Sequence, residues 1–255
     1  MNGPVIIARR LSALAPLAAE TVALLESLSD IRQAPAGSEM VADQAALRPR
    51  FLINGWGARV RFLADGRRQI LSFVLPGDGL GLCERPNPIA LTPVVAITPV
   101  QWVEADRIAA AAFGGDNPDL EDALHIAAAL DEACLLDHVV RLGRQTALER
   151  LSHLFLELRD RLTRVDLVQD QAFAFPVTQE QLADAAGLSA VHVNRTLQSL
   201  RNDDLIEYQH GRLRLLRPAL LETLADYRAP MVSGWTSARH GADGHRAPFL
   251  SGHNP

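Results

Sequence analysis

The stretch VTQEQLADAAGLSAVHVNRTLQ, residues 177–198, places polar side chains along a short helical segment where a buried helix would not tolerate them. Thr178 followed three residues later by Gln181 is a capping box, which predicts that a helix begins there. Gly187 permits the left-handed backbone that ends a helix, and Ser189 can cap the next helix. The stretch therefore predicts two short helices joined by a three-residue turn.

Two helices joined by so short a turn cross steeply and need a small residue where they touch. Ala183 stands four residues before Gly187, and Val193 stands six residues after it, where it can fill the gap. Ala, Gly and a β-branched residue at these offsets are the signature of a helix-turn-helix. The rest of its predicted core is formed by Leu182, Leu188, Leu197 and Leu200.

In a helix-turn-helix the second helix lies in the major groove of DNA, which would keep a polar row exposed. Arg195 is the strongest candidate for reading a base, because arginine can fork onto guanine O6 and N7. Five arginines against three carboxylates between 195 and 217 favour contact with phosphates. The alternative is a merely solvated helix face. The predicted DNA-binding residues are Thr178, Gln179, Ser189, Ala190, Val191, His192, Asn194, Arg195, Gln198 and Arg212.

The flanking segments predict further elements. Two short apolar strands around His210-Gly211 predict a hairpin that forms a wing. Between 31 and 103, short apolar runs alternate with turn signals, which predicts an antiparallel β domain, and Asp65-Gly66 predicts a hairpin with a two-residue turn. Residues 10–28 read as one amphipathic helix.

Residues 118–143 predict a long helix that ends at a glycine, and 145–162 predict a second, amphipathic helix. Alternating steps of four and three residues along the long helix are typical of a two-helix coiled coil. The alternative is a single helix lying on the β domain. The predicted dimerisation residues are Leu124, Ala128, Asp131, Leu135, His138 and Leu142.

Composition limits the function classes. The 255 residues carry a net charge of −5, so contact with nucleic acid requires a local patch. Two cysteines, Cys83 and Cys134, are too few for a zinc site, an all-cysteine iron–sulfur site or a disulfide framework, so we expect a reduced, cytoplasmic protein. No apolar run is long enough for a membrane span, and the apolar N-terminal stretch does not read as a targeting segment.

The arrangement resembles the CRP/FNR family of bacterial transcription regulators, in a form like its alphaproteobacterial members. The resemblance covers about 30–220 and rests on GWGARVRFLADGRRQILSFVLPGD, QTALERLSHLFLELRDRL and PVTQEQLADAAGLSAVHVNRTLQSLRNDDLI. It implies an α+β fold with an N-terminal antiparallel β-roll like that of cyclic-nucleotide-binding domains, a long dimerisation helix and a C-terminal winged helix-turn-helix. It also implies a homodimer on a two-fold related DNA operator, with RNA polymerase as a candidate partner and an effector sensed by the roll or the dimer helix.

Departures from the family pattern argue against its known effectors. Ala90 and Leu91 stand where cyclic-nucleotide binders carry the Arg-Ser or Arg-Thr pair that holds the cyclic phosphate, and Arg85 is displaced. The family's oxygen sensors need four cysteine ligands, and haem ligation by Cys83 or a histidine is disfavoured. Val191 replaces a glutamate that reads cytosine in many members, which implies a different operator. We therefore expect no cofactor and no metal, and an effector that is either absent or a molecule other than cyclic AMP.

The expected organisation is a β-roll domain with flanking helices at 1–117, a dimerisation helix at 118–143, a winged helix-turn-helix at 144–228 and a disordered tail at 229–255. An enzyme is disfavoured, because GDGLG at 77–81 does not open a helix after a parallel strand and no hydrolase or metalloprotease motif is present. The remaining alternative is a winged helix that binds another protein.

Overall fold

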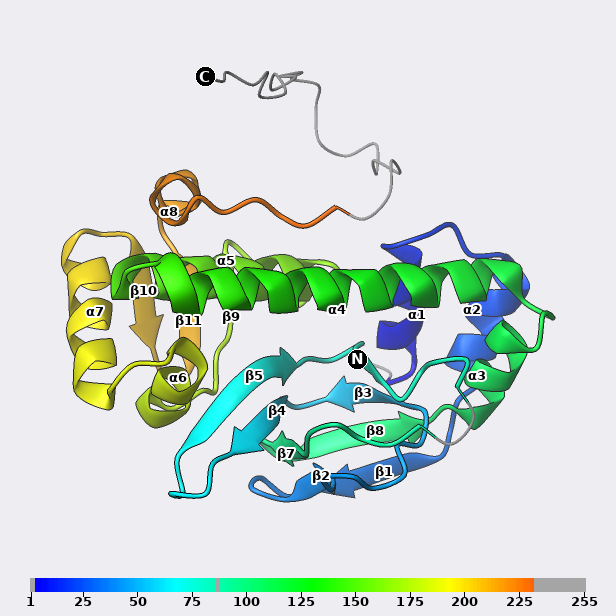
Figure 1. Ribbon diagram of the computed structural model, residues 1–255. Helices are drawn as coiled ribbons and strands as arrows, with labels where there is room; N and C mark the ends of the chain where they lie inside the picture. The colour runs from blue at the N-terminus through cyan, green and yellow to red at the C-terminus, as the bar shows by residue number, and fades with distance from the viewer. Residues whose placement is uncertain (1–2, 86–87, 232–255) are drawn as a thin grey trace, which may run out of the picture.

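The long helix α4 (Pro118–Arg144) crosses the whole molecule above two β-sheets (Figure 1). The structure, a computed structural model, describes residues 3–85 and 88–231. Short helices lie beside the N-terminal half of α4, and a separate group of helices and strands lies at its C-terminal end. The predicted α+β fold, with a β-roll, a long helix and a helix-turn-helix unit, is confirmed.

Two four-stranded antiparallel sheets form the β-roll. The first has the order β1 (Ile31–Ala34), β8 (Val100–Glu104), β3 (Arg50–Asn54), β6 (Gly79–Leu80). The second has the order β2 (Glu39–Val41), β7 (Val94–Ala96), β4 (Gly57–Phe62), β5 (Arg68–Val74). Leu52, Val74 and Val94 from the two sheets pack into one apolar cluster. The strand-and-turn pattern between 31 and 103 therefore predicted the roll correctly.

The β4–β5 hairpin has a longer turn than the sequence predicted. Leu63 donates to the Arg67 carbonyl at 2.8 Å, and Gly66 donates to the Leu63 carbonyl at 3.0 Å. Three residues therefore form the loop, and of Asp65 and Gly66 only Gly66 has a positive φ, at 84°. A single left-handed glycine suits a three-residue loop, whereas a two-residue type I′ turn needs two positive φ values.

The predicted helix over 10–28 is two helices, α1 (Val5–Ser12) and α2 (Ala19–Glu26). Pro16 interrupts the segment, because proline has no N–H to donate and disfavours helical backbone at the residue before it. Both helices still bury apolar side chains, including Ile7 and Leu25, in a core shared with α4 and with α3 (Asp106–Phe113). The apolar sides of the segment are as predicted, and the prediction of one continuous helix is wrong because of the break at Pro16.

Two residues separate α4 from α5 (Ala147–Thr163). Thr146 caps α5 in a capping box with Glu149, and Gln145 has an extended backbone. The prediction that α4 ends at Gly143 is wrong by one residue, because Arg144 is still helical and Gly143 has no positive φ. The cap of the following helix, not the glycine, fixes the end of α4.

A buried network of charged side chains connects α1, the roll, α4 and α5. Glu157 accepts hydrogen bonds from Arg141 and from Arg161, the latter at 3.3 Å. Arg161 also donates to Asp78 at 2.5 Å, and Arg10 lies 3.6 Å from the other oxygen of Asp78. All five side chains are buried. Buried charges are tolerated only when they are paired, so this network fixes how the roll packs against the two helices.

Two buried histidines beside this network make folding depend on pH. Burial, reinforced by Arg141, lowers the pKa of His138 and of His153 from 6.5 to about 4. Between these values the unfolded chain binds protons that the folded chain does not. The contribution of the two neutral histidines to the free energy of unfolding is therefore complete above pH 6.5. It is lost as the pH falls toward 4 and the unfolded chain takes up protons.

We expect the melting temperature, followed by circular dichroism, to fall as the pH is lowered from 6.5 to about 4. A His153→Gln variant removes one of the two titrating groups and should show a shallower fall over the same range. A melting temperature that stays constant across this range would contradict the assignment.

The C-terminal unit holds two elements that the sequence did not predict. The connector at 163–177 contains β9 (Ala172–Ala174), which pairs with β11 (Arg212–Leu215), and β11 pairs with β10 (Ile206–Gln209). Helix α8 (Pro218–Ala225) packs against α5 and buries Leu221. Of the tail predicted to be disordered at 229–255, residues 232–255 lie outside the described residues.

Candidate nucleic-acid interface

Helix α6 (Gln179–Ala186) begins at the predicted capping box. The Thr178 hydroxyl accepts from the backbone N–H of Gln181 at 3.1 Å, and the Gln181 side chain accepts from the backbone N–H of Thr178 at 2.9 Å. Two N–H groups that the first helical turn leaves without partners are satisfied in this way. The start of the first helix is therefore fixed by two side chains three residues apart.

Gly187 ends α6 in the left-handed conformation, with φ 63° and ψ 40°. Ser189 then caps α7 (Ala190–Asn202) by accepting from the backbone N–H of His192 at 3.2 Å. A Cβ at Gly187 would meet the side chain of Leu142 at 3.0 Å, so the end of α4 lies against this turn. The three-residue turn and both of its caps are confirmed.

The contact between α6 and α7 is built from small and branched side chains. Ala183 and Val193 are both buried, as the turn geometry requires. Leu197 and Leu200 extend this core toward α5, while Leu188 is partly buried at its edge. With one side of α7 so fixed, the opposite side faces solvent.

That opposite side of α7 carries the predicted base-reading residues. Val191, His192, Arg195 and Gln198 are exposed, and Asn194 is half-buried. Asn194 donates to the side-chain oxygen of Gln179 on α6 at 3.1 Å, so these two amides orient one another. Within 3–85 and 88–231, Arg195 has no hydrogen bond or ion pair with another side chain. Its guanidinium is therefore available to a ligand.

The wing turns at His210-Gly211 between β10 and β11. Both residues have positive φ, 51° and 69°, which is the type I′ turn that a two-residue hairpin favours. Arg212 follows the turn and is exposed. Arg201 is one of the five arginines between 195 and 217 that were expected to face phosphates. In the structure it is half-buried, and its guanidinium lies 5.8 Å from the centre of the Tyr208 ring.

Three of the predicted dimerisation residues face their own chain. Leu124 and His138 are buried, and Asp131 lies 3.7 Å from the guanidinium of Arg59 on the roll. Leu142 is half-buried beside Gly187. The expectation that Leu124 and His138 lie on a face open to a second helix is therefore wrong, while Asp131 is half-buried beside Arg59. The roll and α5 occupy that side of α4.

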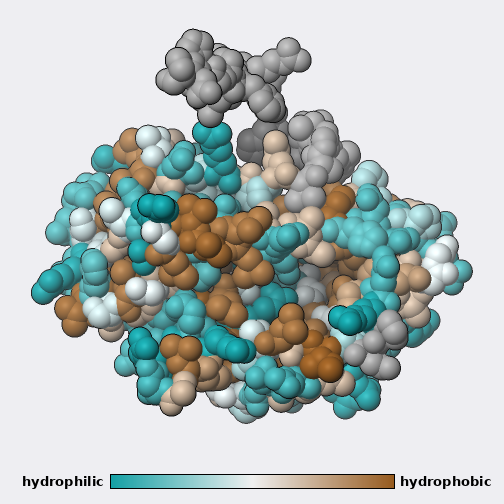
Figure 2. All heavy atoms as spheres, viewed as in Figure 1, coloured by the Kyte–Doolittle hydropathy of each residue, from teal (hydrophilic) through white to brown (hydrophobic). Residues whose placement is uncertain are grey.

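The exposed apolar face of α4 is displaced from the predicted one. Ala128 and Leu135 lie on it as predicted. Three residues that the sequence analysis missed are more exposed than Leu135, namely Leu136, Val139 and Val140. Figure 2 shows apolar side chains gathered over the C-terminal half of α4. We call Ala128, Leu135, Leu136, Val139 and Val140 the α4 stripe.

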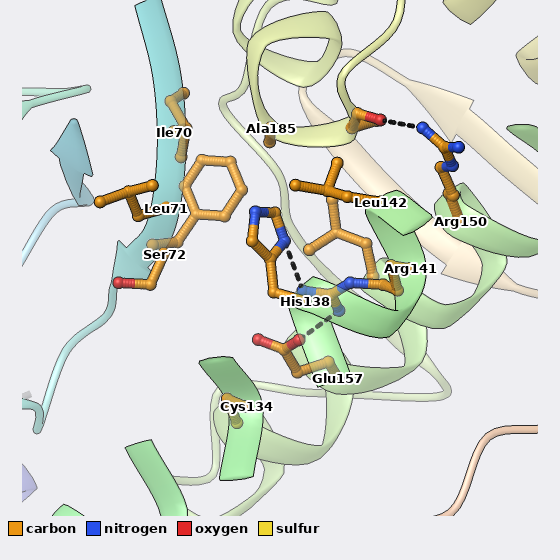
Figure 3. Close-up of a pocket in the computed structure, with 13 residues that line it drawn as sticks. Ile70, Leu71, Ser72, Cys134, His138, Arg141, Leu142, Arg150, Glu157 and Ala185 are labelled. Carbon is orange, nitrogen blue, oxygen red and sulfur yellow. Dashed lines mark hydrogen bonds and ion pairs between the residues drawn. The ribbon is translucent and has the colours of Figure 1, made fainter. Parts of the chain in front are cut away.

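A groove of about 1010 Å³ lies between the roll and α4. Ala90 is buried and Leu91 is exposed along it, at the positions where the family's phosphate-holding pair would stand. Most of its lining is apolar, and Cys83 and Arg85 are among the lining residues. The other cysteine, Cys134, faces a separate pocket beside His138 and Arg141 (Figure 3), and burial raises its pKa to about 12. That thiol stays protonated at neutral pH.

The turn, the free polar side of α7 and the wing define a winged helix-turn-helix protein. Residues 149–224 match the Crp-like helix-turn-helix domain family. The nitrogen fixation regulation protein FixK of Bradyrhizobium diazoefficiens is 34% identical over 167 residues, which cover 65% of this chain and 68% of FixK. The transcriptional activatory protein AadR of Rhodopseudomonas palustris is 29% identical over 196 residues, which cover 76% of this chain and 80% of AadR.

Among solved structures, FixK2 from Bradyrhizobium japonicum superposes with a TM-score of 0.67 at 25% identity, covering 78% of this chain and 98% of FixK2. The chain belongs to the CRP/FNR family of bacterial transcription regulators. It is a DNA-binding regulator, like the regulation proteins named above. In the part of the chain that the structure describes, no helix is long and apolar enough to cross a membrane.

Proposed function

We propose that the chain acts as a homodimer that binds a two-fold related operator, with one α7 in each of two successive major grooves. The free polar side of α7 carries this proposal, and the α4 stripe supports it. Apolar side chains exposed along one helix are what a symmetric helix pair would cover. Dimers of this kind place their recognition helices one DNA turn apart, about 34 Å.

The contacts divide into two kinds. Arg195 would read guanine, and Asn194 and Gln198 would read adenine, through paired hydrogen bonds to base edges. The Gln179–Asn194 hydrogen bond at 3.1 Å supports this assignment, because a held amide loses less freedom on binding. Thr178 and Arg212 would contact phosphates. The remaining residues at the DNA face are Ser189, Ala190, Val191 and His192.

Control of the dimer is proposed to come from the roll. An effector would bind in the groove between the roll and α4 and shift the population of DNA-competent dimers. We propose an effector other than a cyclic nucleotide, because Ala90 and Leu91 offer no charge to a cyclic phosphate. The proposal also includes domain boundaries after residues 117, 143 and 228. It further includes a cytoplasmic location and contact with RNA polymerase.

Salt dependence tests DNA binding against binding of a protein partner. A preferred site would be selected from random-sequence DNA, and its affinity measured at several salt concentrations. A dimer that contacts several phosphates should lose affinity linearly on a log–log plot, with a slope near −0.9 per phosphate. A flat slope would overturn the assignment of this surface and favour the protein-binding alternative.

Changing Val139 to Asp should dissociate the dimer. The side chain of Val139 is 68% exposed in the single chain, so the substitution leaves the fold of one chain intact. In the dimer it would bury two like charges close to the two-fold axis, which costs several kcal/mol. We expect the dimer dissociation constant, measured by sedimentation, to rise on the order of 100-fold. Operator affinity should fall with it.

Leu220→Asp is the matched control, because Leu220 is an exposed apolar residue on α8, 52% exposed and outside the α4 stripe. It should leave both the dimer and operator affinity unchanged. Equal behaviour of the two variants would contradict pairing through α4.

A further inference from the structure

Three side chains with metal-ligating chemistry meet between the roll and the N-terminal half of α4. Glu84 belongs to the segment that follows β6, and Glu121 and His125 belong to α4. One ligand atom from each of the three lies within 4.8 Å of the other two. The cysteine count, on which the expectation of no metal rests, does not bear on a site formed by carboxylates and one imidazole.

The spacing of these atoms suits a divalent cation. Glu121 and His125 are four residues apart, so they lie on one side of the helix and can bind the same ion. The His125 Nε2 atom lies 3.3 Å from a carboxylate oxygen of Glu84. Ligands at the usual distance of about 2.1 Å from a metal are roughly 3.0 to 3.4 Å from one another in octahedral or tetrahedral sites. Small side-chain rotations would close the set.

The surroundings leave these ligands free for a cation. Neither Glu84 nor Glu121 forms an ion pair with an arginine within 3–85 and 88–231. The ring of His125 packs against the ring of Phe113, the last residue of α3, with 6.0 Å between the ring centres. Two carboxylates without an arginine partner repel one another, and a bound cation would neutralise both.

We infer that Glu84, Glu121 and His125 bind a divalent first-row transition-metal ion, with water completing its coordination. One imidazole and two carboxylates suit Zn²⁺, Fe²⁺ or Mn²⁺ better than Mg²⁺ or Ca²⁺, which prefer oxygen ligands alone. The ion would tie the segment after β6 to α4. Cys83 and Arg85, the two neighbours of Glu84 in the chain, line the groove, so metal binding would fix this part of its wall.

Calorimetric titration of the chelator-treated full chain with Zn²⁺, Mn²⁺ and Mg²⁺ tests the site directly. We expect one Zn²⁺ or Mn²⁺ per chain and no comparable binding of Mg²⁺. Glu84→Gln, Glu121→Gln and His125→Gln should each weaken the apparent affinity at least about tenfold. The side chains of Glu84 and His125 are 66% and 53% exposed, so their substitution should leave the melting temperature of the metal-free chain unchanged.

Asp122→Asn is the matched control, because it removes one exposed carboxylate from the neighbouring position of α4. It should bind metal like the unchanged chain. Failure of Zn²⁺ and Mn²⁺ to bind, or binding that all three site variants retain, would overturn the inference. The second outcome would place the ion elsewhere, for example on the histidines of the C-terminal tail.

The effect on DNA is a separate measurement and rests on the proposed function. Zn²⁺ should change operator affinity of the unchanged chain and have no effect on His125→Gln. Metal binding is read without DNA, so a failure of the operator experiment leaves the titration result standing, and the two proposals fail independently.

Discussion

An Arg195→Ala dimer is expected to bind DNA and to lose its preference for the operator. The Arg195 side chain is exposed on α7 and has no partner among the described residues, so it is free to fork onto guanine. A good bidentate contact contributes about 1–3 kcal/mol of discrimination. Two half-sites double this contribution, so the ratio of operator to random-sequence affinity should fall by at least about 30-fold.

Competition binding at one fixed salt concentration measures this ratio. Arg212→Ala is the control, because Arg212 lies on the wing and is assigned to a phosphate. It should weaken binding to operator and random DNA equally and lower the salt slope by about one per half-site. If Arg195→Ala keeps the ratio and Arg212→Ala loses it, the two roles have been assigned the wrong way round.

The helix-turn-helix could be predicted residue by residue because its determinants are local. The capping box of Thr178 and Gln181 and the left-handed Gly187 each act within a few residues of chain. The same holds for the wing turn at His210-Gly211. Where backbone conformation and hydrogen bonding are decided over three or four residues, a single sequence carries the information needed.

The orientation of α4 could not be predicted in the same way. Its sequence is apolar on more than one side, so the predicted row and the α4 stripe both offer apolar side chains, and they share Ala128 and Leu135. The choice between them is made by the roll, through contacts such as Arg59 with Asp131, and by α5 through Arg141 and Glu157. These partners lie 16 to 72 residues apart, so the pattern of the helix alone leaves the choice open.

The missed strand β9 and the Glu84–His125 contact have the same cause. Strand β9 is three residues long and exists only because β11 pairs with it, with Arg212 opposite Ala174. His125 meets Glu84 across 41 residues of chain. The wrong prediction of one helix over 10–28 has a different cause. The break at Pro16 is local, and the sequence contains the signal for it.

Replacing Glu157 with Gln is expected to destabilise the fold strongly. Glu157 is buried and accepts hydrogen bonds from both Arg141 and Arg161, and these guanidiniums keep its pKa below the usual value despite burial. Loss of its charge leaves Arg141 buried without a counter-ion, while Arg161 retains Asp78. Breaking one partner of a buried pair costs about 3–5 kcal/mol of unfolding free energy.

A double-mutant cycle measured by urea denaturation separates this mechanism from a simple packing loss. Arg141→Met should also destabilise, because it leaves part of the Glu157 charge without its partner. In the double variant Arg141→Met, Glu157→Gln neither uncompensated charge remains, so its loss of stability should be smaller than the sum of the single losses. Additive losses would mean that the two side chains are not coupled. Since Arg141 lies at the end of α4 and Glu157 on α5, strong coupling would place this pair at the joint through which the roll and α4 position the DNA-binding unit.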